Sequence, residues 1–110
     1  MTETPDRRAS DRRPLRVSAR VLLPNDQSFD VRTLDIGAGG MGIVAGANPR
    51  PGTSFAIQFT LPAKANQGPM PLQVKVKVAN SVLDHAGFKI GLQFLALEPA
   101  MERVIRQFLM

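Results

Sequence analysis

Residues 72–79 have the sequence LQVKVKVA, in which Leu or Val occupies every second position. A period of two is that of a β-strand, because successive side chains point to opposite faces of a sheet. Valine is β-branched and favours strands. We therefore predict a strand over residues 72–79, with its valines in a core and its lysines in solvent. The pattern leaves an extension as far as Leu83 open.

The same alternation recurs in both directions from this segment. Residues 55–61, FAIQFTL, are a clear case. Further strands are predicted over residues 17–23, 29–34, 41–45 and 88–94. Between the strands lie segments rich in Pro, Gly, Asn and Asp, which favour turns and loops. These segments are residues 24–26, 37–40, 46–52, 62–70 and 85–87.

The C-terminal segment changes period. Its apolar residues follow the spacing i, i+3, i+4, i+7, i+8, which is one stripe of a helix: Met101, Val104, Ile105, Phe108 and Leu109. Pro99 suits the first turn, where a missing N–H costs nothing. The predicted fold is mainly β, a small six-stranded antiparallel barrel with one C-terminal α-helix over residues 99–109. The helix would cover one opening or edge of the barrel.

A chain of 110 residues, 44% of them apolar, suits one domain with a modest core. We place this domain at residues 14–110. Residues 1–13 lack apolar periodicity and are expected to form a flexible arginine-rich arm. There is no cysteine, which excludes disulfides and thiolate chemistry and is compatible with the cytoplasmic location that we expect. No apolar run suits a signal peptide or membrane insertion.

The positive charge is concentrated near the N-terminus. The net charge is +5, and the arm and the residues after it hold Arg7, Arg8, Arg12, Arg13 and Arg16. Guanidinium binds phosphate bidentately and stacks on bases, so an all-arginine arm favours an anionic, nucleotide-like partner. The alternative is a solvated tail that aids solubility.

A glycine-rich segment, GAGGMG, follows the strand predicted over residues 29–34. It matches the G-x-G-x-x-G pattern, but no helix fits after it, so a Rossmann dinucleotide site is excluded. A tight connection between strands fits better, because glycine allows positive φ and close approach of a planar ligand. Asp35 would lie at the strand end, where its carboxylate suits the N1–H and N2–H₂ edge of guanine. The alternative is an ordinary turn in which Asp35 binds backbone amides.

The sequence offers no catalytic centre. His85, the single histidine, lies in a predicted turn, and Asp84 beside it has no nucleophile to activate. There is no metal-ligand cluster and no carboxylate pair. We therefore expect neither an enzyme nor a metal site.

Taken together, the arm and the turn resemble the two motifs of the PilZ domain family. Residues 12–16, RRPLR, fit R-x-x-x-R, and residues 35–40, DIGAGG, fit [D/N]-x-S-x-x-G except at Gly37, which replaces serine. The C-terminal segment, FKIGLQFLALEPAMERVIRQFL, resembles the family's last strand and helix. The resemblance covers residues 8–110.

This resemblance implies a bacterial second-messenger receptor that binds cyclic di-GMP and needs no cofactor. Arg12 and Arg16 would contact phosphates and guanine faces, with Arg13 assisting. Asp35 would bind a guanine edge, and Gly40 would keep the turn tight. Ligand binding would change contacts with a downstream protein, which the sequence does not identify.

Gly37 stands at the position where the family's serine would bind the ligand. Without the serine hydroxyl, the ligand would lose one hydrogen bond, which would cost about 0.5–1.5 kcal/mol of binding free energy, or roughly tenfold in affinity. The departure motivates one alternative, a PilZ-like adaptor that binds no nucleotide. Another alternative is a basic β-barrel that binds nucleic acid. The lack of Tyr and Trp argues against the latter, since such barrels stack bases on exposed aromatic residues.

Overall fold

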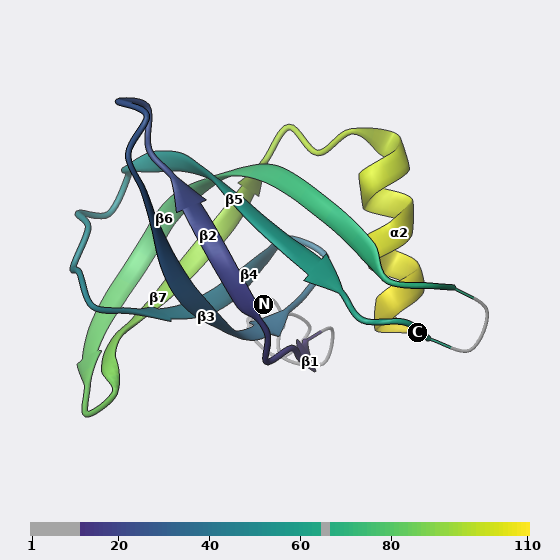
Figure 1. Ribbon diagram of the computed structural model, residues 1–110, viewed down its shortest axis with the longest axis horizontal. Coiled ribbons are helices and arrows are strands. Elements are labelled where there is room, and N and C mark those ends of the chain that lie inside the picture. The colour runs from purple at the N-terminus through teal and green to yellow at the C-terminus, as the bar shows by residue number, and fades with distance from the viewer. Residues whose placement is uncertain (1–11, 65–66) are drawn as a thin grey trace, which may run out of the picture.

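The computed structural model of the chain describes residues 12–64 and 67–110. Most of this part is β-structure, followed by a helix at the C-terminal end (Figure 1). The elements in chain order are β1 (Arg13–Pro14), β2 (Ser18–Leu22), β3 (Ser28–Ile36), β4 (Gly40–Ala45), β5 (Ser54–Leu61), β6 (Met70–Asp84), β7 (Gly87–Leu95) and α2 (Pro99–Leu109).

The sheet closes on itself. Its strand order is β1-β3-β2-β5-β6-β7-β4, every pairing is antiparallel, and β3 also pairs with β4. Strands β2 to β7 therefore form a closed six-stranded antiparallel barrel, which confirms the predicted fold. Closure removes the exposed edges that an open sheet presents. β1 is an extra short strand beside the end of β3.

Apolar side chains fill the barrel, and they alternate with exposed residues along each strand. In β6, Val74, Val76 and Val78 are buried, whereas Lys75 and Lys77 are exposed. This is the alternation that predicted the strand, and it follows from the two-residue period of β-structure.

Helix α2 packs on the barrel through its apolar stripe, with Ile105 fully buried. The Lys64 ammonium donates a hydrogen bond to the carbonyl oxygen of Phe108 at 2.6 Å and lies 5.3 Å from the centre of its ring. This contact ties the end of the helix to the loop between β5 and β6 (Figure 1). In the described part of the chain, no helix has the length and apolar character needed to cross a membrane.

The six predicted strands and the helix are all present. Most strand ends differ from the prediction by one or two residues, and β6 extends to Asp84, beyond Leu83. β1 was not predicted, because a two-residue strand shows no periodicity. The expected arm over residues 1–13 falls largely outside the described residues, which begin at Arg12; Arg7 and Arg8 lie outside them.

Candidate functional site

The arm and the glycine turn lie side by side because β1 pairs with the end of β3. Arg13 lies opposite Ile36, and Pro14 lies opposite Asp35. Arg12 extends its side chain to Asp35, and its Nη1 donates a hydrogen bond to Asp35 Oδ1 at 2.9 Å. The two side chains are partly exposed, at 28% for Arg12 and 41% for Asp35. Two motifs that are distant in sequence thus form one site.

The three predicted arginines differ in their surroundings. Arg12 is the arginine that pairs with Asp35. Arg13 is exposed, and its Nη1 donates a hydrogen bond to the carbonyl oxygen of Arg12 at 3.1 Å. Arg16 is exposed as well. Arg12 and Arg13 thus lie beside the end of β3, whereas Arg16 lies further from the turn, next to Thr33 and Leu34.

Arg16 lies at a break between β1 and β2 that is held by Thr33 of β3. The Thr33 hydroxyl accepts a hydrogen bond from the Val17 N–H at 2.9 Å and donates one to the carbonyl oxygen of Leu15. Backbone hydrogen bonds join Leu15 N–H to Leu34 at 3.0 Å and Thr33 N–H to Val17 at 2.9 Å. Arg16 is thus exposed between two residues that are both bonded to β3. This role of Thr33 was not predicted from the sequence.

Gly37 and Gly40 close the connection from β3 to β4, where the Gly37 N–H donates to the Gly40 carbonyl at 2.8 Å. A Cβ added to Gly40 would lie 2.1 Å from the carbonyl oxygen of Leu92. Gly40 therefore allows β4 to approach β7 closely. Glycine allows positive φ, but among the described glycines only Gly52 and Gly87 have it, and neither lies in this turn. The turn needs glycine for space and not for φ.

Gly37 lies against the side chain of Arg12. A Cβ at this position would be 3.3 Å from Arg12 Cδ and 3.5 Å from Nε. The missing side chain therefore lets Arg12 cross the turn on its way to Asp35. A serine here would displace Arg12 by a few tenths of an ångström, which a flexible arginine can accommodate.

Gly42 also belongs to the candidate site, and it was not predicted from the sequence. It lies opposite Asp35, and a Cβ there would be 2.9 Å from Asp35 Oδ1. The carboxylate thus occupies space that any other residue at position 42 would take. The sequence offered one sign of this, because Gly42 is the last glycine of the GAGGMG segment. That Gly42 lies directly opposite Asp35 is seen in the structure.

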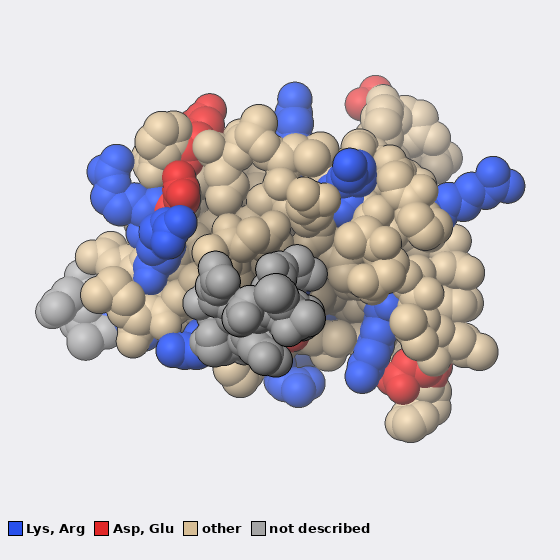
Figure 2. Space-filling view, turned by 180° about the vertical axis from the view of Figure 1, so that it is seen from behind, with Lys and Arg blue, Asp and Glu red and all other residues tan. Residues whose placement is uncertain are grey.

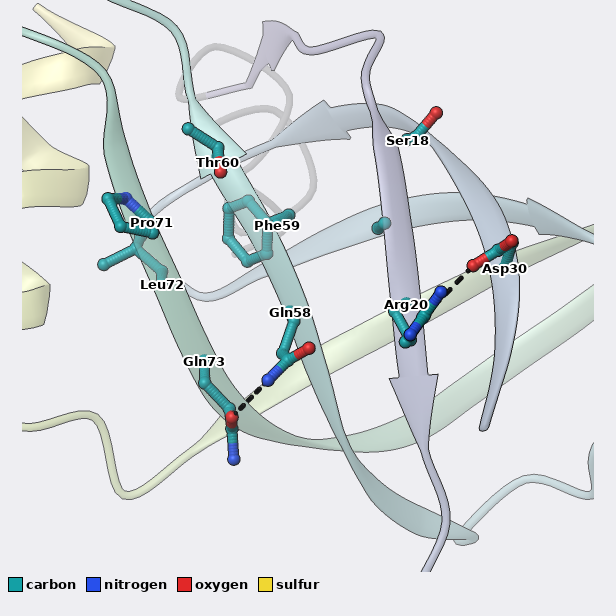
Figure 3. Close-up of a pocket in the computed structure, with 10 residues that line it drawn as sticks. Ser18, Arg20, Asp30, Gln58, Phe59, Thr60, Pro71, Leu72 and Gln73 are labelled. Carbon is teal, nitrogen blue, oxygen red and sulfur yellow. Dashed lines mark hydrogen bonds and ion pairs between the residues drawn. The ribbon is translucent and has the colours of Figure 1, made fainter. Parts of the chain in front are cut away.

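A hollow lies on the outer surface of β2, β3, β5 and β6, with a volume of about 600 Å³ (Figure 3). Its polar groups already pair with one another: Arg20 Nε with Asp30 Oδ1 at 3.3 Å, and Gln58 Nε2 with Gln73 Oε1 at 2.7 Å. None of the predicted site residues lines it. The lining residues are Ser18, Ala19, Arg20, Asp30, Gln58, Phe59, Thr60, Pro71, Leu72 and Gln73.

Outside the candidate site, the basic side chains and the side chains that could bind a metal are dispersed. On the face in Figure 2, the visible Lys and Arg side chains are spread around the surface and do not gather in one patch. Within residues 12–64 and 67–110, no group of three or more His, Cys, Asp or Glu side chains could hold a metal. His85 is fully exposed at the β6–β7 hairpin, with its Nδ1 4.0 Å from Asp84 Oδ1.

Residues 6–110 match the PilZ domain family over nearly the whole chain. The chain belongs to this family. PilZ domains are binding and regulatory domains. This PilZ chain keeps both arginines of the first motif, Arg12 and Arg16, and the Asp35 and Gly40 of the second, with Gly37 at the serine position. A search of curated proteins found no match.

Solved structures share the fold. The Bacillus subtilis inhibitor of motility, MotI/DgrA, matches with a TM-score of 0.77 and 16% identity over 89% of this chain and 47% of its own. Escherichia coli YcgR, solved in complex with cyclic di-GMP, matches with 0.72 and 17% over 87% and 41%. This PilZ chain therefore spans less than half the length of either protein.

A third structure is close to this chain in size. The PilZ domain of CeSA from a cellulose-synthesizing bacterium matches with a TM-score of 0.63 and 13% identity, over 89% of this chain and 93% of its own. At such low identities the likeness establishes the fold alone. The functional argument therefore depends on the residues of this PilZ domain.

Proposed function

We propose that this PilZ domain is a cytoplasmic receptor for cyclic di-GMP that relays binding to a partner protein. The observation that carries the proposal is the 2.9 Å contact between Arg12 and Asp35, which joins the arm and the turn in one site. Membership of the PilZ family and the fold shared with a protein solved in complex with cyclic di-GMP support it.

Each site residue has a role that its chemistry suits. The guanidinium groups of Arg12 and Arg16 bind phosphate and stack on guanine, with Arg13 assisting. The Asp35 carboxylate accepts hydrogen bonds from guanine N1–H and N2–H₂, an edge that adenine does not present. Gly37 and Gly40 leave room at the turn.

The Arg12–Asp35 ion pair does not prevent nucleotide binding. Ion pairs between exposed side chains stabilise proteins by only about 0–1 kcal/mol, so breaking this one would cost at most about fivefold in affinity. A carboxylate also accepts several hydrogen bonds, so Asp35 can bind guanine while Arg12 stays near.

Isothermal titration calorimetry with cyclic di-GMP tests the proposal. We expect binding by the wild type, and its loss in Arg16→Ala. Arg50→Ala is the matched control, because Arg50 is an exposed arginine in the loop between β4 and β5, outside the site. No heat change at tens of micromolar ligand, or equal loss in both variants, would contradict the proposal.

A second candidate is an adaptor that binds no nucleotide and acts through protein contacts alone. One observation favours it: Gly37 lacks the hydroxyl of the motif. A positive titration with cyclic di-GMP removes this candidate. Nucleic-acid binding has less support, since Phe29 is the one exposed residue among the six phenylalanines.

A further inference from the structure

Four residues form a row across the outer face of the barrel, beginning at the proposed site. Asp35 of β3 lies opposite Gly42 of β4. Gly42 lies opposite Gly91 of β7, and Gly91 lies opposite Asn80 of β6. Residues that are directly opposed in an antiparallel sheet point to the same face. The row therefore has a polar side chain at each end and two glycines between them.

The polar groups fill the space that the glycines leave. A Cβ at Gly42 would lie 2.9 Å from Asp35 Oδ1, and a Cβ at Gly91 would lie 2.9 Å from Asn80 Oδ1 and 3.2 Å from Nδ2. Opposed Cβ positions are about 5 Å apart, so the carboxylate and the carboxamide lie within roughly 11 Å of each other. A planar base that is hydrogen-bonded on two edges fits only near this upper limit.

β-Bulges aim both polar residues at this face. Val78 lies opposite Leu92 and Asn80 lies opposite Gly91, so Ala79 is an extra residue in β6. A second register shift in β3 immediately precedes Asp35. Bulges re-aim side chains and are frequent beside functional sites. Asn80 is exposed as a result and is accessible to a ligand.

Two basic residues lie on the same face, two residues along the strands from the pair Gly42 and Gly91. Val44 lies opposite Arg32 on one side and Lys89 on the other, and both basic residues are exposed. Two residues along a strand correspond to about 7 Å. The row therefore lies beside positive charge, which suits a ligand that has both a base and phosphates.

We propose that Asn80 is a further ligand-binding residue of this site. While Asp35 binds the N1–H and N2–H₂ edge of guanine, the Asn80 Nδ2–H donates to N7 or O6, the acceptors on the other edge of the same base. Gly42 and Gly91 are positioning residues, because a methyl group at either one would displace the polar group that lies over it. This inference rests on the proposed binding of cyclic di-GMP.

Titration of Asn80→Ala and Asn80→Asp with cyclic di-GMP tests it. We expect Asn80→Ala to weaken binding about three- to tenfold, the worth of one hydrogen bond. Asn80→Asp should bind more weakly still, because a carboxylate would face the acceptors N7 and O6. Because the added negative charge near the phosphates would also weaken binding, the loss in Asn80→Ala is the result that decides the role of the Asn80 amide. The matched control is Asn48→Ala, an exposed asparagine in the loop between β4 and β5.

A second pair of variants tests the positioning role. Gly91→Ala should weaken binding as much as Asn80→Ala. Gly46→Ala should not, because nothing lies within 4 Å of a Cβ at Gly46. Circular dichroism melting curves verify that each variant is folded.

The outcomes separate this inference from the proposed function. Wild-type binding that is lost in Asp35→Ala but unchanged in both Asn80 variants overturns the role of Asn80 and leaves the receptor function in place. If the wild type does not bind cyclic di-GMP, both are overturned.

Discussion

At the scale of the residue, the proposed site depends on Asp35. Its Oδ1 accepts the hydrogen bond from Arg12 and also covers the open position at Gly42. Pairing with β1 and β4 holds its backbone on both sides. A carboxylate whose backbone is fixed in this way and whose side chain is still 41% accessible is already in place for a ligand.

We expect Asp35→Asn to weaken binding of cyclic di-GMP only moderately, about three- to tenfold, because the motif [D/N]-x-S-x-x-G admits asparagine at this position. The amide keeps the size of the side chain but replaces one acceptor oxygen by a donor, which would face the donors of guanine. Calorimetric titration measures the loss. Asp30→Asn is the control, since Asp30 is also on β3 and also pairs with an arginine, Arg20. Similar losses in both variants would show that the charge, and not the site, matters.

Gly37→Ser should tighten the binding of cyclic di-GMP, because it restores a hydroxyl at the position of the motif serine, worth about 0.5–1.5 kcal/mol. Gly37→Ala separates this gain from crowding, since it adds only the Cβ that would lie 3.3 Å from Arg12 Cδ. We expect the serine variant to bind more tightly than both the alanine variant and the wild type. Equal or weaker affinity of the serine variant than the wild type would refute this account of Gly37.

At the scale of the element, the arm is presented by the break between β1 and β2. The first strand of the barrel does not run straight into the arm, because the Thr33 hydroxyl bonds both sides of the break, at Leu15 and Val17. Thr33 is the one polar residue among the buried residues of the described chain. The buried hydroxyl bonds both neighbours of Arg16, so the position of Arg16 depends on the packing of β3.

Thr33→Val should lower the free energy of unfolding by about 1–3 kcal/mol, because the Val17 N–H and the Leu15 carbonyl lose their partner inside the protein. Urea denaturation measures the loss. Thr33→Ser keeps the hydroxyl and should retain more of the stability. The control Thr60→Val, at an exposed position of β5, should change it by less than about 0.5 kcal/mol. If the Thr33→Val variant is as stable as the wild type and binds the ligand with unaltered affinity, the Thr33 hydroxyl does not place Arg16 for binding.

At the scale of the whole molecule, barrel closure makes one site from distant segments. The pairing of β3 with β4 and of β4 with β7 brings Asp35, Gly42 and Gly91 into one row. A ligand that spans the arm and several strands would bind the folded barrel and not the unfolded chain. Binding must therefore add to the stability of the domain.

Cyclic di-GMP at one hundred times its Kd should raise the free energy of unfolding by about 2.7 kcal/mol. The rise should be visible as an increase in Tm by differential scanning calorimetry. Arg16→Ala should lose most of this increase, whereas Arg50→Ala should keep it. A Tm that does not depend on ligand concentration in the wild type would argue against binding at this site.

Much of the fold follows from local pattern. The two-residue period in LQVKVKVA and FAIQFTL predicted β6 and β5, and the apolar stripe after Pro99 predicted α2, because one buried face requires such spacing. β1 was missed, since two residues have no period. For the site, the residues of the two motifs were named from the sequence, but their roles in binding stay predictions.

Residue type and near neighbours were enough to predict the strands, the helix and the chemical groups available for a ligand. Which groups meet is known from the folded chain alone: Arg12 with Asp35, Thr33 with Leu15, and the Asn80 amide with the open face of Gly91. These contacts depend on strand register, bulges and barrel closure. Such features arise from the packing of distant segments and leave no periodic trace along the chain.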